Sequence, residues 1–172
     1  MRVAALLLAL VAAGTAEPVL HVAARWEPSG LRVELHLSGP LPEAMEKALP
    51  SGAVVRVLYP LKVRSRRRLW WDKKLFSSEA ESLVAFDPLT GRYRCQFRLG
   101  DVVISVHETA SIEAARGWLT DPPPFHIVIA RRRPHVRIEA RAIFASGTTW
   151  LVFPSSAGTE WVEAQVPAED DR

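Results

Sequence analysis

The sequence contains a single cysteine, Cys95, among its 172 residues, so the chain cannot form an intramolecular disulfide bond. Small secreted domains often compensate for a limited core with disulfides. A chain without them must be held together by its hydrophobic core. Cys95 itself falls on the apolar side of an alternating segment, which predicts a small buried side chain rather than a reactive thiol.

The sequence also lacks an apolar run long enough to span a bilayer, which takes about 20 residues. Its first residues, "MRVAALLLALVAAGTA", place one cation before a short apolar run and small residues after it. That order is typical of a secretory signal peptide, and we expect residues 1–16 to be removed by cleavage after Ala16. No cysteine is present there to carry a lipoprotein anchor. The sequence therefore predicts an exported protein, and the absence of disulfides favours the bacterial periplasm.

A strong net charge is missing as well. The chain has 22 Lys and Arg against 19 Asp and Glu, a formal net charge of +3. Loss of Arg2 with the signal peptide leaves 21 cations against 19 acids, or +2. A balance this small produces no field of one sign over the whole surface, so electrostatic binding must come from local clusters of charge.

Catalytic signatures are absent from the sequence. It contains no G-x-S-x-G nucleophile motif, no H-E-x-x-H zinc motif and no glycine-rich phosphate loop. Of its five histidines, His21 and His36 are expected to face each other across a hairpin, as solvated neighbours rather than metal ligands. We predict no metal site, no cofactor and no enzymatic activity. The enzyme alternative is a site assembled from dispersed residues such as His126, His135 and Glu139.

Alternation of apolar and polar residues dominates the chain. The segments "VLHVAARWE" and "LRVELHL" alternate strictly around a turn at residues 27–30, which predicts a hairpin with one buried face. The stretch "FDPLTGRYRCQFRL" predicts a second hairpin around a turn at residues 87–91. In "VVRVLYPLKVR", Pro60 cannot donate a backbone hydrogen bond and therefore predicts an edge or a bulge.

Two segments do not follow this alternation of apolar and polar residues. Residues 41–49, "LPEAMEKAL", and 109–119, "TASIEAARGWL", have the composition and spacing of short helices, the second with Thr109 or Ser111 as its N-cap. The pattern predicts a mostly β fold, an antiparallel β-sandwich-like domain with two short helices, over residues 17–165. Residues 166–172 are expected to form a polar tail. The predicted core includes Val22, Leu35, Val57, Trp71, Phe97, Ile104, Ile127 and Ile138.

The most unusual stretch is "SRRRLWWDKKLF", at residues 65–76, with five cations and two adjacent tryptophans. We interpret it as a strand, in which neighbouring side chains point in opposite directions. Trp71 is then assigned to the core and Trp70 to the surface. The predicted partner-binding residues on the polar face are Arg66, Arg67, Arg68, Trp70 and Lys74. A second cationic block, "RRRPH" at residues 131–135, lies far away in the sequence.

Several functions fit such a cationic and aromatic stretch. Nucleic-acid binding is typical of this composition but does not suit an exported protein. Each cation near an anionic lipid surface is attracted to it by about 1 kcal/mol. The same cations could instead recognise an acidic patch on a partner protein. The alternative without a binding role is a half-buried strand whose arginines are solvated and cover Trp70.

The order of features from "RRLWWDKKLF" through "FDPLTGRYRC" to "ETASIEAARGWL" resembles the bacterial family known as domain of unknown function 4390. Family members share an exported N-terminus, a short helix before a strand, an arginine-rich tryptophan segment, a leucine-threonine turn before a Tyr-Arg strand, and an alanine-rich helix. The corresponding residues here are 41–49, 54–63, 66–71, 89–94 and 109–119. The resemblance covers residues 19–144 and implies no catalytic residues. After Phe144 this sequence lacks the proline-rich stretch associated with the family.

The resemblance also implies a kind of partner, because family members are often encoded beside membrane sensor kinases. We therefore predict an exported, non-enzymatic interaction module associated with an envelope sensor kinase. It would dock a membrane-protein ectodomain through the Arg66–Trp70 surface or by adding a strand at an exposed sheet edge. The alternative is a peripheral binder of anionic envelope lipid, which is not an integral membrane protein once processed.

Overall fold

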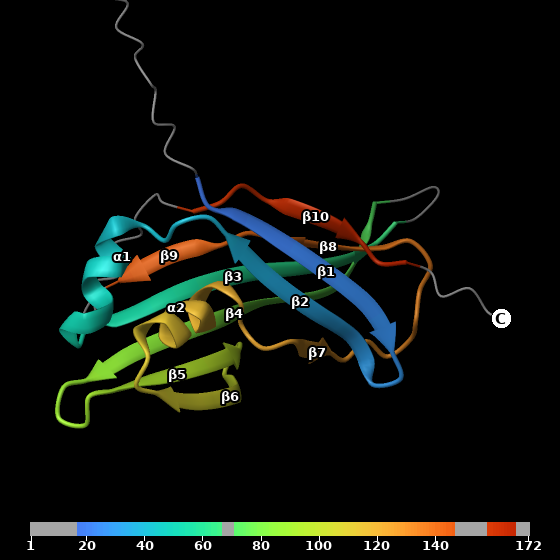
Figure 1. Ribbon diagram of the computed structural model, residues 1–172. Coiled ribbons are helices and arrows are strands. Elements are labelled where there is room, and N and C mark those ends of the chain that lie inside the picture. Colours follow the sequence, from blue (N-terminus) through green and yellow to red (C-terminus); the bar gives the residue numbers. More distant parts are fainter. Residues whose placement is uncertain (1–16, 67–70, 147–157, 168–172) are drawn as a thin grey trace, which may run out of the picture.

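The computed structural model of the protein describes residues 17–66, 71–146 and 158–167. These residues form two antiparallel β-sheets with two α-helices, which confirms the predicted mostly β, sandwich-like fold (Figure 1). The predicted signal peptide, with cleavage after Ala16, lies outside the described residues. None of the helices in the described part of the chain is long and apolar enough to cross a membrane.

The three-stranded sheet has the order β1-β2-β7, and its first two strands form the predicted hairpin. Its strands are β1 (Val19–Glu27), β2 (Gly30–Ser38) and β7 (Phe125–Ile127). Gly30 ends the turn with a φ of 137°, and a Cβ built on it would lie 2.5 Å from the carbonyl oxygen of Ile127. Glycine is therefore required where β7 approaches the hairpin.

The larger sheet has seven strands in the order β10-β8-β3-β4-β5-β6, with β9 beside β3. The strands are β3 (Val54–Ser65), β4 (Lys73–Asp87), β5 (Arg92–Leu99), β6 (Val102–Thr109), β8 (Val136–Ala140), β9 (Ile143–Ser146) and β10 (Val162–Gln165). The predicted hairpin turn at residues 87–91 joins β4 to β5, and the Asp87 carboxylate accepts hydrogen bonds from the Leu89 amide and the Thr90 hydroxyl.

Pro60 lies inside the larger sheet, not at its edge. Its strand, β3, pairs along its whole length with β4, and on the other side with β9 at residues 55–58 and β8 at residues 61–65. The neighbouring strand is interrupted at Arg141 and Ala142, where Ala142 exchanges hydrogen bonds of 2.9 Å with Thr159 instead. The register shift between β3 and β4 falls at Val63, not at Pro60. A gap in the adjacent strand, and not an edge or a bulge at Pro60, accommodates the missing donor.

Both predicted helices are present, as α1 (Glu43–Ala48), followed by the short 3-10 helix η1 (Leu49–Ser51), and α2 (Ile112–Thr120). Ser111 is the N-cap of α2, and its hydroxyl accepts a hydrogen bond of 3.2 Å from the Ala114 amide. The C-terminal turn of α2 is tied to the larger sheet by two buried hydroxyls. Tyr59 donates to the carbonyl oxygen of Leu119 at 2.6 Å, and Ser82 donates to that of Trp118 at 2.7 Å.

The core lies between the two sheets and beneath the helices. Of the eight predicted core residues, the structure buries five, which are Leu35, Val57, Phe97, Ile127 and Ile138. Val22 is half-buried. The assignment of Ile104 and Trp71 to the core is wrong, because both side chains are exposed. Ile104 lies on β6 where the register with β5 shifts, at the edge of the sheet and beyond the part that the second layer covers.

The chain after Phe144 contributes to the larger sheet. Strand β10 pairs with β8, and the Val166 amide donates to the Val136 carbonyl oxygen at 2.9 Å. Val166, the first residue of the predicted polar tail, is buried. The residues from 147 to 157 and from 168 onward lie outside the described part.

We predict that Tyr59→Phe lowers the free energy of unfolding by about 1–3 kcal/mol, because it leaves the buried Leu119 carbonyl without a donor. Urea denaturation measures the loss. Tyr93→Phe is the matched control, since Tyr93 is also buried and its hydroxyl has no hydrogen bond within the described residues. Equal losses in the two variants would contradict a specific role for the Tyr59 hydroxyl.

Candidate interaction surface

The segment Arg66 to Asp72 connects two antiparallel strands and is not a strand where the structure describes it. Pairing runs from Val54 opposite Ala85 to Ser65 opposite Lys73, so the chain must reverse direction between β3 and β4. The interpretation of "SRRRLWWDKKLF" as one strand with Trp71 in the core is therefore wrong. Trp71 lies in the connection and is 91% exposed.

The predicted binding residues divide into two groups. Arg66 and Lys74 are both exposed, the first in the connection and the second near the start of β4. Arg67, Arg68 and Trp70 lie outside the described residues. Lys73, beside Lys74, is exposed as well.

The second arginine run ends against the first. The Arg66 amide donates to the His135 carbonyl oxygen at 3.0 Å, and the Ser65 hydroxyl donates to that of Pro134 at 3.4 Å. Figure 1 shows the β3–β4 and β7–β8 connections at the same end of the sandwich, on the right. The sequence left open whether the two runs meet, and the structure places Arg66, the described residue of the first run, beside Pro134 and His135, which directly follow Arg133.

We name this region the cationic end. It comprises the exposed residues Arg66, Trp71, Lys73, Lys74, Arg131, Arg132 and Arg133. The carboxylate nearest to it in sequence, Asp72, is half-buried and is held by the Arg137 guanidinium, with Nη2 2.6 Å from Oδ2. Arg137 also pairs with Glu163 at 3.2 Å. Asp72 thus anchors the connection to β8 while its own charge is compensated.

A polar cleft of about 680 Å³ lies at the base of the cationic end. It is lined by Arg66, Asp72, His135, Val136, Arg137, Glu163, Gln165, Val166 and Pro167. His135 adopts a φ of 53° there, an uncommon conformation for a residue other than glycine. Because the acidic side chains in the cleft are paired with Arg137, its floor is a closed ion-pair network rather than a set of available ligands.

Sequence reasoning placed Asp72 in this region but did not identify Arg137 and Glu163 as its partners there. Each is an ordinary charged residue in a strand or a loop. Only the pairing of β3 with β8, and of β8 with β10, brings them together. No local sequence pattern carries that information.

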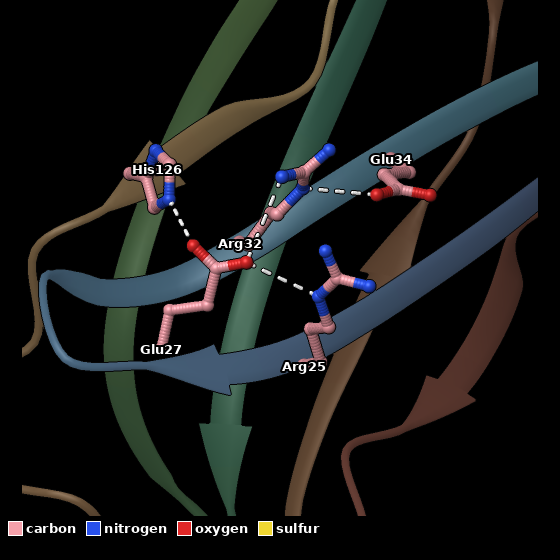
Figure 2. Close-up of polar contacts among 5 residues, drawn as sticks. All are labelled: Arg25, Glu27, Arg32, Glu34 and His126. Carbon is pink, nitrogen blue, oxygen red and sulfur yellow. Dashed lines mark hydrogen bonds and ion pairs between the residues drawn. The ribbon is translucent and has the colours of Figure 1, made fainter.

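Of the three residues of the enzyme alternative, His126 lies in the smaller sheet, whereas Glu139 and the cleft that contains His135 share Arg137. His126 is on β7, where its Nε2 lies 2.7 Å from Oε2 of Glu27 (Figure 2). Glu139 is on β8 in the other sheet, 3.6 Å from Arg64. His135 lies at the cleft. His21 and His36 face each other as expected, with ring centroids 6.1 Å apart, and the described residues contain no group of three or more potential metal ligands.

The Glu27 carboxylate is the centre of a polar cluster at the turn of the first hairpin. Besides His126, it contacts Arg25 at 3.1 Å and Arg32 at 3.6 Å (Figure 2). The His126 hydrogen bond is the largest influence on the pKa of Glu27 and lowers it below its ordinary value; desolvation opposes this shift, and Arg25 and Arg32 lower the pKa further. The cluster joins β7 to the hairpin, because His126 lies opposite Arg32 in the sheet register.

We predict that Glu27→Gln destabilises the protein near neutral pH and has a much smaller effect in acid. A carboxylate with a lowered pKa in the folded state contributes stability above its ordinary pKa, and that contribution is lost as the pH falls through the lowered value. Urea denaturation at both pH values measures it. The control is Glu160→Gln, which removes an exposed carboxylate with no ion pair among the described residues. A loss for Glu27→Gln that is the same at both pH values would contradict the prediction.

Comparison with known proteins identifies a family but no characterised relative. The family described as "Domain of unknown function (DUF4390)" matches residues 21–146, well over half of the chain. No curated protein matches, and no solved structure matches. The match includes both hairpins, both helices and the two arginine runs, as the resemblance seen in the sequence had indicated. The chain belongs to the DUF4390 family.

Proposed function

We propose that this protein is an exported, non-enzymatic interaction module of the bacterial envelope. It docks an acidic surface on the ectodomain of a membrane protein through the cationic end. The observation that carries the proposal is the meeting of the two arginine runs, through the backbone contacts of Arg66 with His135 and of Ser65 with Pro134. These contacts support the proposal that two short clusters that are separate in the sequence form one surface.

Charge supports this assignment. The cationic end presents arginines from two connections and lysines from the start of β4, whereas the nearby carboxylates Asp72 and Glu163 both pair with Arg137. The chain as a whole is nearly balanced, so this region is more cationic than the average of the chain. A local positive patch steers an acidic partner during association and sets its orientation.

Trp71 supplies an anchor of a different kind. Its side chain is 91% exposed, next to cations that keep the region soluble. Tryptophan and arginine are the residues most enriched among those that dominate binding energy at protein interfaces. An exposed tryptophan on a loop suits contact with a partner better than it suits a guarded strand, since Trp71 lies outside any strand.

The identity of the partner class rests on the family. Members are often encoded beside membrane sensor kinases, and we propose that the ectodomain of such a kinase carries the acidic surface. Export by residues 1–16 to the periplasm belongs to the same proposal, because only there would the two surfaces meet.

We predict a discrete protein adduct when a photoreactive residue replaces Trp71 in the native host. The double variant Arg131→Glu/Arg133→Glu should reduce the adduct severalfold, because it reverses charge at the cationic end. The control variant Arg92→Glu/Arg94→Glu reverses two exposed arginines of β5 that lie opposite Asp87 and Ala85, at the end of β4 away from Lys73 and Lys74, and should leave the adduct unchanged.

Binding to lipid vesicles distinguishes a lipid surface from a protein partner. Purified protein is mixed with vesicles of phosphatidylglycerol and with vesicles of phosphatidylcholine, at low and high salt. Salt-sensitive binding to the anionic vesicles, together with lipid adducts alone at position 71, would replace the protein partner by a lipid surface. A protein adduct that is indifferent to Arg131→Glu/Arg133→Glu would overturn the role of the cationic end.

A further inference from the structure

The chain leaves the larger sheet at the cationic end. After β10, the Val166 amide donates to the Val136 carbonyl oxygen at 2.9 Å, and Pro167 lines the polar cleft together with Arg66 and His135. Figure 1 shows the end of β10 on the same side of the sandwich as the β3–β4 and β7–β8 connections. The residues that follow Pro167 therefore begin at the cleft.

The sequence after Pro167 is acidic. It is "AEDDR", in which three consecutive carboxylates, Glu169, Asp170 and Asp171, precede one arginine. Nowhere else in the chain are even two acidic residues adjacent. We name residues 169–171 the acidic segment. The one concentrated block of negative charge in the sequence thus follows directly on the part of the chain that lines the cleft.

Several cations beside the cleft have no acidic partner. Its two carboxylates, Asp72 and Glu163, both pair with Arg137. By contrast, no carboxylate in the described part of the chain forms an ion pair with three exposed cations of the cationic end, which are Arg66, Lys73 and Lys74. These three charges remain available to an acid that lies outside the described residues.

The acidic segment is close enough in the chain to supply that acid. An extended chain spans at most about 3.3–3.6 Å per residue, so the Cα atoms of the whole segment lie within about 14 Å of that of Pro167. Arg66 and Asp72 line the same cleft as Pro167, and Lys73 follows Asp72 directly. A tether this short gives an effective concentration on the order of millimolar. The tether therefore favours this segment over an acid of another molecule.

We propose that the acidic segment binds the cationic end of its own chain, and that a docking partner must displace it. The second half of this inference rests on the proposed function, because the segment occupies the surface at which an acidic partner docks. Exposed ion pairs are individually weak, so the segment competes with a partner without excluding it. Only a partner with more carboxylates, or better placed ones, displaces the segment, and the contact thereby selects against weakly acidic surfaces.

A carbodiimide, which joins a carboxylate to a lysine amine without a spacer, tests the contact in the purified chain. At low salt we expect mass spectrometry to find the acidic segment coupled to Lys73 or Lys74, and high salt should suppress this coupling. An equal mixture of isotopically light and heavy protein identifies links within one chain. Lys47 is the control, because its amine lies 2.6 Å from Oε1 of Glu43 and should couple there but not to the acidic segment.

Two results would overturn the contact. The first is coupling of Lys47 to Glu43 without any coupling of the acidic segment to Lys73 or Lys74. The second is coupling of the segment to Lys47 as often as to Lys73 and Lys74, or only between light and heavy chains.

Displacement is measured with a fluorescently labelled decaglutamate peptide as the acidic probe. Asp170→Asn/Asp171→Asn should bind the peptide severalfold more tightly than the unchanged protein, because less of the competing charge remains. The control is Glu108→Gln/Glu160→Gln, which changes the net charge equally by removing two exposed carboxylates that have no ion pair among the described residues. The same gain in affinity for both variants would show a general effect of net charge and would overturn the displacement.

The contact and the proposed function fail in different experiments. Coupling of the acidic segment to Lys73 or Lys74, with no protein adduct from position 71 in the native host, would retain the contact and remove the docking function. A protein adduct that depends on Arg131 and Arg133, with no such coupling, would retain the docking function and remove the contact.

Discussion

The rest of the structure depends on the alternation of side chains along β3. Every second residue from Val55 to Ser65 is buried, and the residues between them face outward. The strand pairs with β4, β8 and β9. Its register therefore determines which side chains of these strands face the core and which face outward. A shift of one residue would exchange the two faces and would move Tyr59 away from α2.

The features that depend on local chemistry could be predicted from the sequence. Strict alternation in "LRVELHL" and "VLHVAARWE" was enough for the first hairpin, because a period of two is specific to strands. Asp87 and Gly91 identified the second turn, and Ser111 identified the start of α2. Each of these depends on residues within a few positions of one another.

The errors share a physical cause. The alternation of apolar and polar residues indicates on which face of a strand a side chain lies. It does not indicate whether another part of the protein packs on that face. Ile104 has the right chemistry for a core, yet β6 lies at an edge. The tryptophan pair was assigned to a strand because nothing local marks the reversal between β3 and β4. The meeting of the two arginine runs could not be predicted, since it follows from the pairing of β3 with β8, which is 71 residues later for the pair Ser65 and Val136.

The lone cysteine has a consequence for the dynamics of the sheet. Cys95 lies between Val84 of β4 and His107 of β6, and burial raises its pKa to about 11, so the thiol is protonated at neutral pH and shielded from reagents. A thiol reagent reaches it when β5 separates from a neighbour. The rate of labelling therefore measures how often the edge of the sheet opens, and the protein carries its own probe of that local unfolding.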